Sequence, residues 1–260
     1  MAKALGIDIG GTGIKAAVVD THSGELLSER LKLPTPAGGS PDDIVKTVLR
    51  LIDNLGGLED GVPVGVCFPA VVRHGRTMSA ANVSRAWIGL EAESLFEKAL
   101  GRDIHFVNDA DAAGYAETRY GAAKGVPGLV LLTTLGTGIG SALIYNEVLI
   151  PNSELGHLIL DGKDAEKRAS FAAKERAHLS WASWARRLQR YYTHLETLFS
   201  PDLFIVGGGV SKSHDLFLPL LALQTPIVPA VHRNNAGILG SAALATVVPG
   251  AASPFDPSAH

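Results

Sequence analysis

An aspartate, a glycine-rich turn and a lysine follow one another at residues 8–15, in the order Asp-Ile-Gly-Gly-Thr-Gly-Ile-Lys. The apolar residues before the turn place the aspartate at the end of a buried strand. Glycines let backbone N–H groups approach a ligand, and the hydroxyl and the ammonium group add what is needed to hold a phosphate and its metal ion. An ordinary glycine-rich hairpin is the alternative for this turn alone. The residues assigned here to the phosphoryl donor are Asp8, Gly10, Gly11, Thr12, Gly13 and Lys15.

A second turn repeats the first, because Gly-Thr-Gly-Ile at 11–14 returns at 136–139, and both copies stand between two strand-like segments. The repeat indicates two related lobes with facing turns, although a four-residue match in a glycine-rich chain can arise by chance. Three glycines at 207–209 let a flat ligand such as adenine approach the backbone, or form a simple strand-to-helix turn. The donor residues predicted on this side are Thr134, Gly136, Thr137, Gly138, Gly207, Gly208 and Gly209.

Two further pairs of polar residues can act on a hydroxylated ligand. Asn108 and Asp109 follow an apolar run, and strand ends in an open α/β sheet face the crevice where ligands bind. Asp109 can accept a proton from a substrate hydroxyl, or it merely caps the helix that follows. Glu154 and His157 stand three residues apart and can converge on vicinal hydroxyls, which suits a sugar. An exposed glutamate beside a structural histidine is the alternative.

The composition excludes several classes of protein. A chain of 260 residues with 46% hydrophobic and 19% charged residues forms a globular protein with a large core, in two lobes or one large unit. The net charge of −3 argues against nucleic acid as the main partner. The single cysteine, Cys67, allows neither an internal disulfide nor a multi-cysteine zinc site, which fits a reducing cytoplasm. Neither GxxxxGK[ST] nor GxGxxG occurs, so P-loop and dinucleotide-binding folds lose their main support.

The apolar pattern predicts elements that position these residues. In the first part of the chain, strands are expected at 3–9, 14–20, 25–32, 62–68 and 104–107, and helices at 42–55 (capped by Ser40), 91–100 and 110–119. This βββαβαβα order indicates a mixed sheet covered by helices. In the second part, helices are expected at 180–199, capped by Ser180, and at 235–247, with a strand at 202–206.

The N-terminus lacks the features of a signal peptide, and no membrane attachment is expected. The uncharged stretch 125–146 is long enough to cross a membrane, but its five glycines and its division into two β-rich runs indicate a buried hairpin.

The motifs DIGGTGIK, ND, GTGIG, ELGH and GGGVS, in this order and spacing, resemble the ROK family of sugar kinases over nearly the whole chain. The segments LIPNSELGH, HLSWASWA, SPDLFIVGGGVSK and TPIVPAVHRNNAGILG are similar to its small polyphosphate glucokinases, above all those that act as polyphosphate/ATP-dependent glucomannokinases. The resemblance implies an actin-like (ribonuclease H-like) α/β fold of two lobes with a duplicated βββαβαβα core. The expected lobes are 1–108, with a C-terminal helix at about 235–248 packing back on it, and 109–234, followed by a disordered tail at 249–260.

The same resemblance implies roles for individual residues. Asp109 falls on the catalytic base and Asp8 on the residue near Mg²⁺, while the sugar ligands are Asn82, Asn108, Asp109, Glu154, His157 and Glu175. The cysteine cluster that binds structural zinc in many ROK proteins is missing from 158–180, so no zinc is expected. Polyphosphate glucokinases share this absence.

The expected activity is phosphorylation of the 6-hydroxyl of glucose, and of mannose, with inorganic polyphosphate, ATP or both as donor. The expected partners are a hexose, polyphosphate, a nucleotide and a second copy in a homodimer, in the cytoplasm, without nucleic acid or membrane. An ATP-only hexokinase is one alternative. A sugar-responsive ROK transcription regulator is the other, but regulators carry a DNA-binding extension before the first strand, which here begins at Lys3.

Positive charge is concentrated at residues 163–190. Eight lysines and arginines and three acids give this segment a charge of +5, so the remainder of the chain carries −8. A long polyanion such as polyphosphate can be attracted to this segment, although a solvated helix face is the simpler explanation of charge alone.

Overall fold

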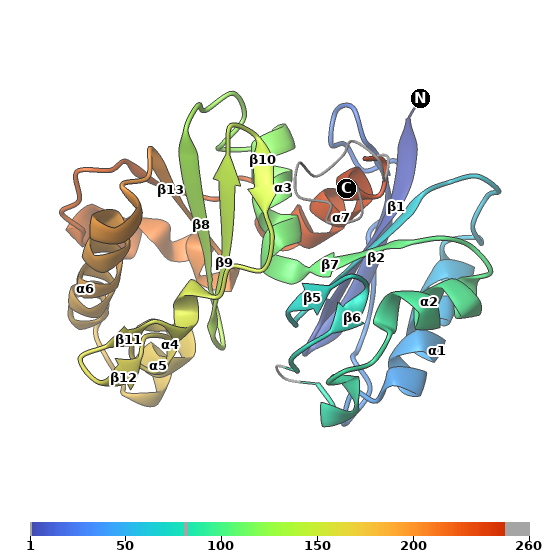
Figure 1. Ribbon diagram of the computed structural model, residues 1–260, viewed down its shortest axis with the longest axis horizontal. Coiled ribbons are helices and arrows are strands. Elements are labelled where there is room, and N and C mark those ends of the chain that lie inside the picture. The colour runs from blue at the N-terminus through green and yellow to red at the C-terminus, as the bar shows by residue number, and fades with distance from the viewer. Residues whose placement is uncertain (1, 81–82, 248–260) are drawn as a thin grey trace, which may run out of the picture.

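Two five-stranded sheets carry the fold of this computed structural model, which describes residues 2–80 and 83–247 (Figure 1). The first sheet contains β1 (Lys3–Gly10), β2 (Gly13–Asp20), β3 (Leu31–Leu33), β4 (Val64–Phe68) and β7 (His105–Asn108). The second contains β8 (Leu129–Leu135), β9 (Ile139–Tyr145), β10 (Val148–Ile150), β13 (Leu203–Gly207) and β14 (Ile227–Pro229).

The two sheets share one topology. Their strand orders are β3-β2-β1-β4-β7 and β10-β9-β8-β13-β14. In each, the first three strands are antiparallel and the last two are added in parallel. The Gly-Thr-Gly-Ile repeat therefore belongs to a duplication of the whole sheet, and the predicted duplicated core is confirmed. The predicted division of the chain into lobes at 108/109 stays a prediction.

Helices cover the outer faces of the sheets and fill the space between them (Figure 1). The helices α1 (Pro41–Asn54) and α2 (Ala92–Leu100) pack on the first sheet, and α6 (Trp181–Phe199) packs on the second. Between the sheets, α3 (Asp109–Tyr120) lies against β9, and α7 (Ala236–Leu244) lies against β1 and β4. The shorter elements are β5 (Val72–Arg73), β6 (Arg76–Thr77), η1 (Arg85–Trp87), η2 (Leu155–His157), β11 (Ile159–Leu160), β12 (Lys163–Asp164), α4 (Glu166–Ala169), α5 (Phe171–Arg176), η3 (Gly209–Leu216), η4 (Leu218–Leu220) and η5 (Arg233–Asn235).

The helix α7 approaches the first sheet at backbone distance. A Cβ atom at Gly65 of β4 would lie 1.8 Å from the carbonyl oxygen of Ser241 in α7, so only glycine fits there. This contact, together with the α3–α7 contact, joins residues far apart in the sequence and fixes the spacing of the two sheets.

Predicted boundaries agree with the structure where local signals mark them. Ser40 and Ser180 accept hydrogen bonds from the N–H groups of Asp43 and Ser183, so both predicted helix caps are confirmed. The uncharged stretch 125–146 forms the predicted hairpin β8–β9. In the part of the chain that the structure describes, no helix is long and apolar enough to cross a membrane.

Two boundaries were wrong. The strand expected at 25–32 is reduced to Leu31–Leu33, because the Ser28 hydroxyl accepts the hydrogen bond of Val18 N–H that a backbone carbonyl would take in a continuous ladder. The helix expected from 235 to 247 or 248 ends at Leu244, where turn-like bonds replace the helical ones. The tail expected at 249–260 lies outside the described residues.

Candidate active site

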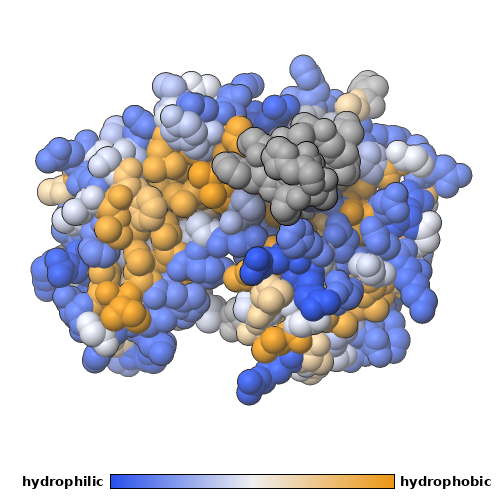
Figure 2. Space-filling model, in the orientation of Figure 1, coloured by the Kyte–Doolittle hydropathy of each residue, from blue (hydrophilic) through white to orange (hydrophobic). Residues whose placement is uncertain are grey.

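A cavity of about 240 Å³ lies where β1, β8, β13 and the beginning of α3 come together. It collects the predicted residues Asp8, Gly10, Lys15, Asp109, Thr134, Gly207, Gly208 and Gly209. The hairpin ends of β1–β2 and β8–β9 point to the same side of the molecule, the lower side in Figure 1. There the surface is notched between its two halves (Figure 2). Residues from both sheets thus form one site.

Asp8 and Lys15 face one another across the β1–β2 hairpin. The strand register pairs them, and Lys15 Nζ donates to Asp8 Oδ2 at 2.6 Å. Cys67 Sγ, on β4, lies 3.8 Å from Asp8 Oδ1. Burial, followed by the charge of Asp8, holds the pKa of this thiol well above its usual range. The cavity wall therefore carries a partly buried ion pair whose carboxylate suits a metal ion and whose ammonium suits a phosphate.

Asp109 is the first residue of α3 and lines the cavity. The helix cap is Asn108, whose Oδ1 accepts from the N–H groups of Ala110 and Asp111 at 2.8 and 3.1 Å, so the interpretation of Asp109 as a mere cap is wrong. Burial and the negative charge of Asp8 raise the pKa of Asp109 to about 7. A carboxyl group with a pKa near neutrality is suited to accept a proton in catalysis.

Asn108, a predicted sugar ligand, is held by its own bonds. Besides the cap, its Nδ2 donates to Ala70 O at 2.9 Å, and the residue is 7% exposed. The amide nitrogen Nδ2 carries two hydrogens, and the described residues accept one of them, so the other is left for a sugar hydroxyl. The clearest function of Asn108 in this structure is to position Asp109.

Glu154 and His157 lie at the two ends of the η2 turn, with Nε2 of the histidine 3.8 Å from Oε2 of the glutamate. Gly156 lets this turn pack directly on β9, because a Cβ there would lie 2.1 Å from Ile139 O. His157 Nδ1 lies 2.9 Å from Asp164 Oδ2, and this hydrogen bond raises the pKa of His157. Burial raises the pKa of Glu154. The two polar side chains therefore stand beside the second Gly-Thr turn, but neither is among the residues that line the cavity.

Other predicted residues lie apart from the cavity. Glu175 is exposed on α5, where its carboxylate pairs with Lys174 at 2.9 Å, and no described contact joins it to Glu154. Thr12 and Thr137 are exposed in the two Gly-Thr turns, beyond the residues that line the cavity. The remaining predicted glycines of these turns also do not line the cavity; they are Gly11, Gly13, Gly136 and Gly138. Asn82 lies outside the described residues.

Comparison with known proteins decides the family. The model of the ROK family matches residues 4–171 and 161–247, which is most of the chain. The chain belongs to the ROK family.

Individual ROK proteins are close to it. The chain is 48% identical to the polyphosphate glucokinase of Mycobacterium tuberculosis (strain CDC 1551 / Oshkosh) over 239 residues, 92% of this chain and 89% of that protein. The crystal structure of the inorganic polyphosphate/ATP-glucomannokinase from Arthrobacter sp. strain KM matches with a TM-score of 0.90 and 52% identity over 94% of this chain and 98% of that chain. A ROK family glucokinase from Streptomyces griseus matches with a TM-score of 0.80 and 26% identity over 93% and 98%. These matches confirm the predicted family and its actin-like α/β fold.

A third wall of the cavity in this ROK protein is formed by residues that were not predicted from the sequence. Arg233 and Asn234 precede α7, and Gly237 lies in its first turn. Glu117, buried on α3, accepts hydrogen bonds from the N–H groups of residues 231 and 232 and so holds this loop in place. The available signal was a run of polar residues directly before a small-residue helix.

The cavity suits a hard cation. Asp8 and Asp109 both line it, and Mg²⁺ binds through one or two carboxylates together with substrate phosphates. Elsewhere in the described residues, ligand atoms of His157, Asp164 and Glu166 lie within 4.8 Å of one another. Protein partners already engage this group, since Asp164 binds the imidazole and Glu166 accepts from Ile139 N–H at 3.3 Å. The absence of zinc stays a prediction.

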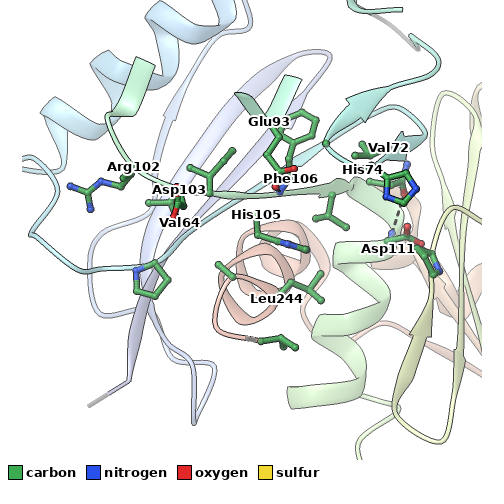
Figure 3. A pocket seen from close by; sticks show the side chains of 18 of the residues that line it. Val64, Val72, His74, Glu93, Arg102, Asp103, His105, Phe106, Asp111 and Leu244 are labelled. Atoms are coloured by element: carbon green, nitrogen blue, oxygen red, sulfur yellow. Dashed lines mark hydrogen bonds between the residues drawn. The ribbon is translucent and has the colours of Figure 1, made fainter. Parts of the chain in front are cut away.

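A larger cavity, of about 1450 Å³, runs along β7 and is lined by His105, Phe106 and Asp111 among others (Figure 3). Asp111 is fully buried, and its Oδ2 accepts from Asn152 N–H at 2.7 Å. None of the described residues that line this cavity belongs to the glycine turns, and Asn108 is the one predicted site residue among them. Its greater volume therefore does not identify this cavity as the catalytic site.

Proposed function

We propose that this ROK protein transfers a phosphoryl group from inorganic polyphosphate or ATP to the 6-hydroxyl of glucose, and also of mannose. The observation that carries the proposal is Asp109, a carboxyl group with a pKa of about 7 on the wall of a cavity shared with Asp8, Lys15 and the glycines at 207–209. The polyphosphate glucokinase and the polyphosphate/ATP-glucomannokinase, at 48% and 52% identity, support this choice of sugars and donors.

Asp109 acts as the general base. Its carboxylate takes the proton of the sugar 6-hydroxyl while that oxygen attacks the terminal phosphorus of the donor. A new P–O bond forms as the bond to the shortened polyphosphate or to ADP breaks, and the proton ends on Asp109. Because phosphoryl transfer needs little covalent help, positioning and charge neutralisation supply most of the rate enhancement.

The surrounding residues orient the two substrates. Glu154 accepts hydrogen bonds from sugar hydroxyls, and His157 presents Nε2 to the sugar because Asp164 holds its Nδ1. Lys15 and the backbone N–H groups of the glycine turns bind the donor phosphates. Mg²⁺ held by Asp8 would neutralise charge on those phosphates when it is bound.

The test is to measure formation of sugar 6-phosphate by the purified protein, with glucose or mannose as acceptor and ATP or long-chain polyphosphate as donor. Both donors should support turnover. EDTA should remove it, Mg²⁺ should restore it, and elemental analysis should find no stoichiometric zinc. Turnover with ATP alone would identify an ATP-only hexokinase. Sugar binding without turnover on either donor would contradict the proposal and favour a regulator.

The proposed cytoplasmic location rests on the single cysteine, Cys67, which fits a reducing compartment, and the proposed homodimer rests on the family resemblance. Light scattering of the purified protein tests the dimer directly.

A further inference from the structure

Four arginines converge on a groove in the half of the molecule that carries the second sheet. A cavity of about 430 Å³ is lined by Arg168 of α4 and by Arg186, Arg187 and Arg190 of α6, and we call it the arginine groove. Among the described residues that line it, Asp161 is the one acid. The volume falls in the range of roughly 300–1,000 Å³ that is typical of ligand sites.

The groove holds more positive charge than its own acid can neutralise. Asp161 contacts Arg190 Nη2 at 3.0 Å and Arg168 Nη1 at 3.6 Å. Arg186 and Arg187 donate instead to neutral acceptors, a serine hydroxyl at 3.0 Å and the carbonyl of Arg168 at 3.1 Å. Four guanidinium groups and one carboxylate leave a charge of +3. Because like charges in one groove repel, an anion bound among them would be stabilising.

A second and independent feature points to a ligand in the same place. Tyr191 lines the arginine groove and is fully buried, and its hydroxyl has no hydrogen-bond partner among the described residues. Buried polar groups are nearly always hydrogen-bonded, so the orphaned hydroxyl of a residue that lines this groove indicates a missing acceptor. Phosphate oxygens accept from phenol and guanidinium groups alike.

The arginine groove is separate from the catalytic cavity but adjoins the second Gly-Thr turn across α4. From this four-residue helix, Glu166 accepts from Ile139 N–H at 3.3 Å on the side of the turn, while Arg168 lines the groove. Just after it, Ala172 N–H donates to Gly136 O at 3.0 Å. The groove and the catalytic cavity have no described lining residue in common. A ligand that occupies both must therefore be long.

We propose that the arginine groove binds the distal part of the inorganic polyphosphate chain while its terminal unit is in the catalytic cavity. This inference rests on the proposed use of polyphosphate as donor. Arginine forks match phosphate oxygens in pairs, and a polyanion releases counterions when it binds, so its affinity falls with salt. ATP in the catalytic cavity is not expected to contact the groove, because the two share no described lining residue. Of the eight basic residues at 163–190, four line the arginine groove. Lys174, by contrast, is buried with Nζ 4.4 Å from the centroid of the Trp181 ring.

The test compares two double variants with the same loss of charge. Arg186→Gln/Arg190→Gln removes two exposed groove arginines, and Lys46→Gln/Arg50→Gln removes two exposed cations at the same spacing on α1. The groove variant should raise KM for long-chain polyphosphate by about tenfold and lessen the slope of log affinity against log salt by about 1.4, as for two lost phosphate contacts. KM for ATP and for tripolyphosphate should change by less than about twofold. The α1 variant should match the wild type with every donor.

Tyr191→Phe provides a second test without a change of charge. It should raise KM for long-chain polyphosphate alone, because the variant lacks the hydroxyl that donates to the chain. Equal losses with ATP, or unchanged KM for long-chain polyphosphate in both groove variants, would overturn the proposal. If the wild type transfers no phosphoryl group from polyphosphate, the proposed donor fails, and direct binding of long-chain polyphosphate then decides on the groove. Weaker binding by Arg186→Gln/Arg190→Gln supports the groove, and equal binding refutes it.

Discussion

Asp109 and Asp111 lie two positions apart in the first turn of α3, and burial raises the pKa of each to about 7. The two carboxyl groups differ in their surroundings. Asp109 lines the catalytic cavity with Asp8, whereas Asp111 is fully buried and accepts a hydrogen bond from Asn152 N–H. A substrate can reach the first carboxyl group, while the second belongs to a contact between α3 and the chain after β10. The same rise in pKa therefore occurs at a carboxyl group on the cavity wall, where we propose a catalytic role, and at one held in a structural contact.

Asp109→Asn should lower kcat by about 10²–10⁴-fold, because the amide keeps the shape of the side chain but is a very weak base. Glucose affinity by calorimetry should stay near the wild type. In the wild type, kcat/KM should rise as the pH increases through about 7, since only the ionised carboxylate accepts a proton. Asp103→Asn, at an exposed acid beside the larger cavity, is the control and should keep full turnover. Near-normal kcat in Asp109→Asn would refute the assignment.

Asp111→Asn should change stability and its dependence on pH. Because the folded-state pKa is raised from 3.8 to about 7, the folded protein binds more protons than the unfolded chain between these values. The associated stability is fully present below about pH 4 and is lost as the pH rises through about 7, up to about 4 kcal/mol. The variant should flatten this loss in urea unfolding at pH 5, 6, 7 and 8, with the wild type as reference. An unchanged slope would mean that Asp111 titrates normally.

At the scale of elements, local signals predicted most of the fold. The helices behind Ser40 and Ser180 were predicted to within one residue, because a capping hydroxyl fixes a helix end from a single position. The strand at 25–32 was overestimated because the Ser28 hydroxyl replaces a backbone acceptor, which no periodicity reveals. Such a side-chain substitution within a ladder is visible only once the neighbouring strand is in place.

The candidate site likewise contains residues that local sequence signals predict and residues that they do not. Asp8 lies near the end of β1, and Asp109 follows β7, so the positions of these residues at strand ends could be predicted from the chain itself. Arg233 and Asn234 reach the cavity only because α7 returns to the first sheet from the far end of the chain. Long-range packing of this kind has no local signal, and the same is true of the orphaned hydroxyl of Tyr191.

Gly65→Ala tests the packing of α7 on the first sheet. The added methyl group would overlap Ser241 O, which is backbone and cannot swing away, so α7 must shift. Overpacking of this kind costs about 1–3 kcal/mol, which lowers the melting temperature by about 2–12 °C in a chain of this size. Gly136→Ala is the matched control, because no atom lies within 4 Å of a Cβ there. A melting temperature within about 1 °C of the wild type for Gly65→Ala would show that the helix is not held at this distance.

At the scale of the whole molecule, the catalytic cavity and the arginine groove differ in how they depend on the two sheets. The cavity takes residues from β1 in the first sheet and from β8 and β13 in the second, with α3 and the loop before α7 between them. The groove takes all its described lining residues from 160–191, in one half. A nucleotide in the cavity would therefore bridge the two halves, whereas the distal part of a polyphosphate chain in the proposed groove would contact one of them.

This difference predicts how a nucleotide stabilises the protein. A nonhydrolysable ATP analogue with Mg²⁺, at about 100 times its dissociation constant, should add about 2.7 kcal/mol and raise the melting temperature by about 5–10 °C. Because the ligand bridges both sheets, calorimetry should record one transition that moves as a whole. Arg186→Gln/Arg190→Gln should show the same shift, since the nucleotide does not reach the arginine groove. If two transitions appear and the analogue moves only one of them, the donor binds to one sheet alone and the shared cavity is not its site.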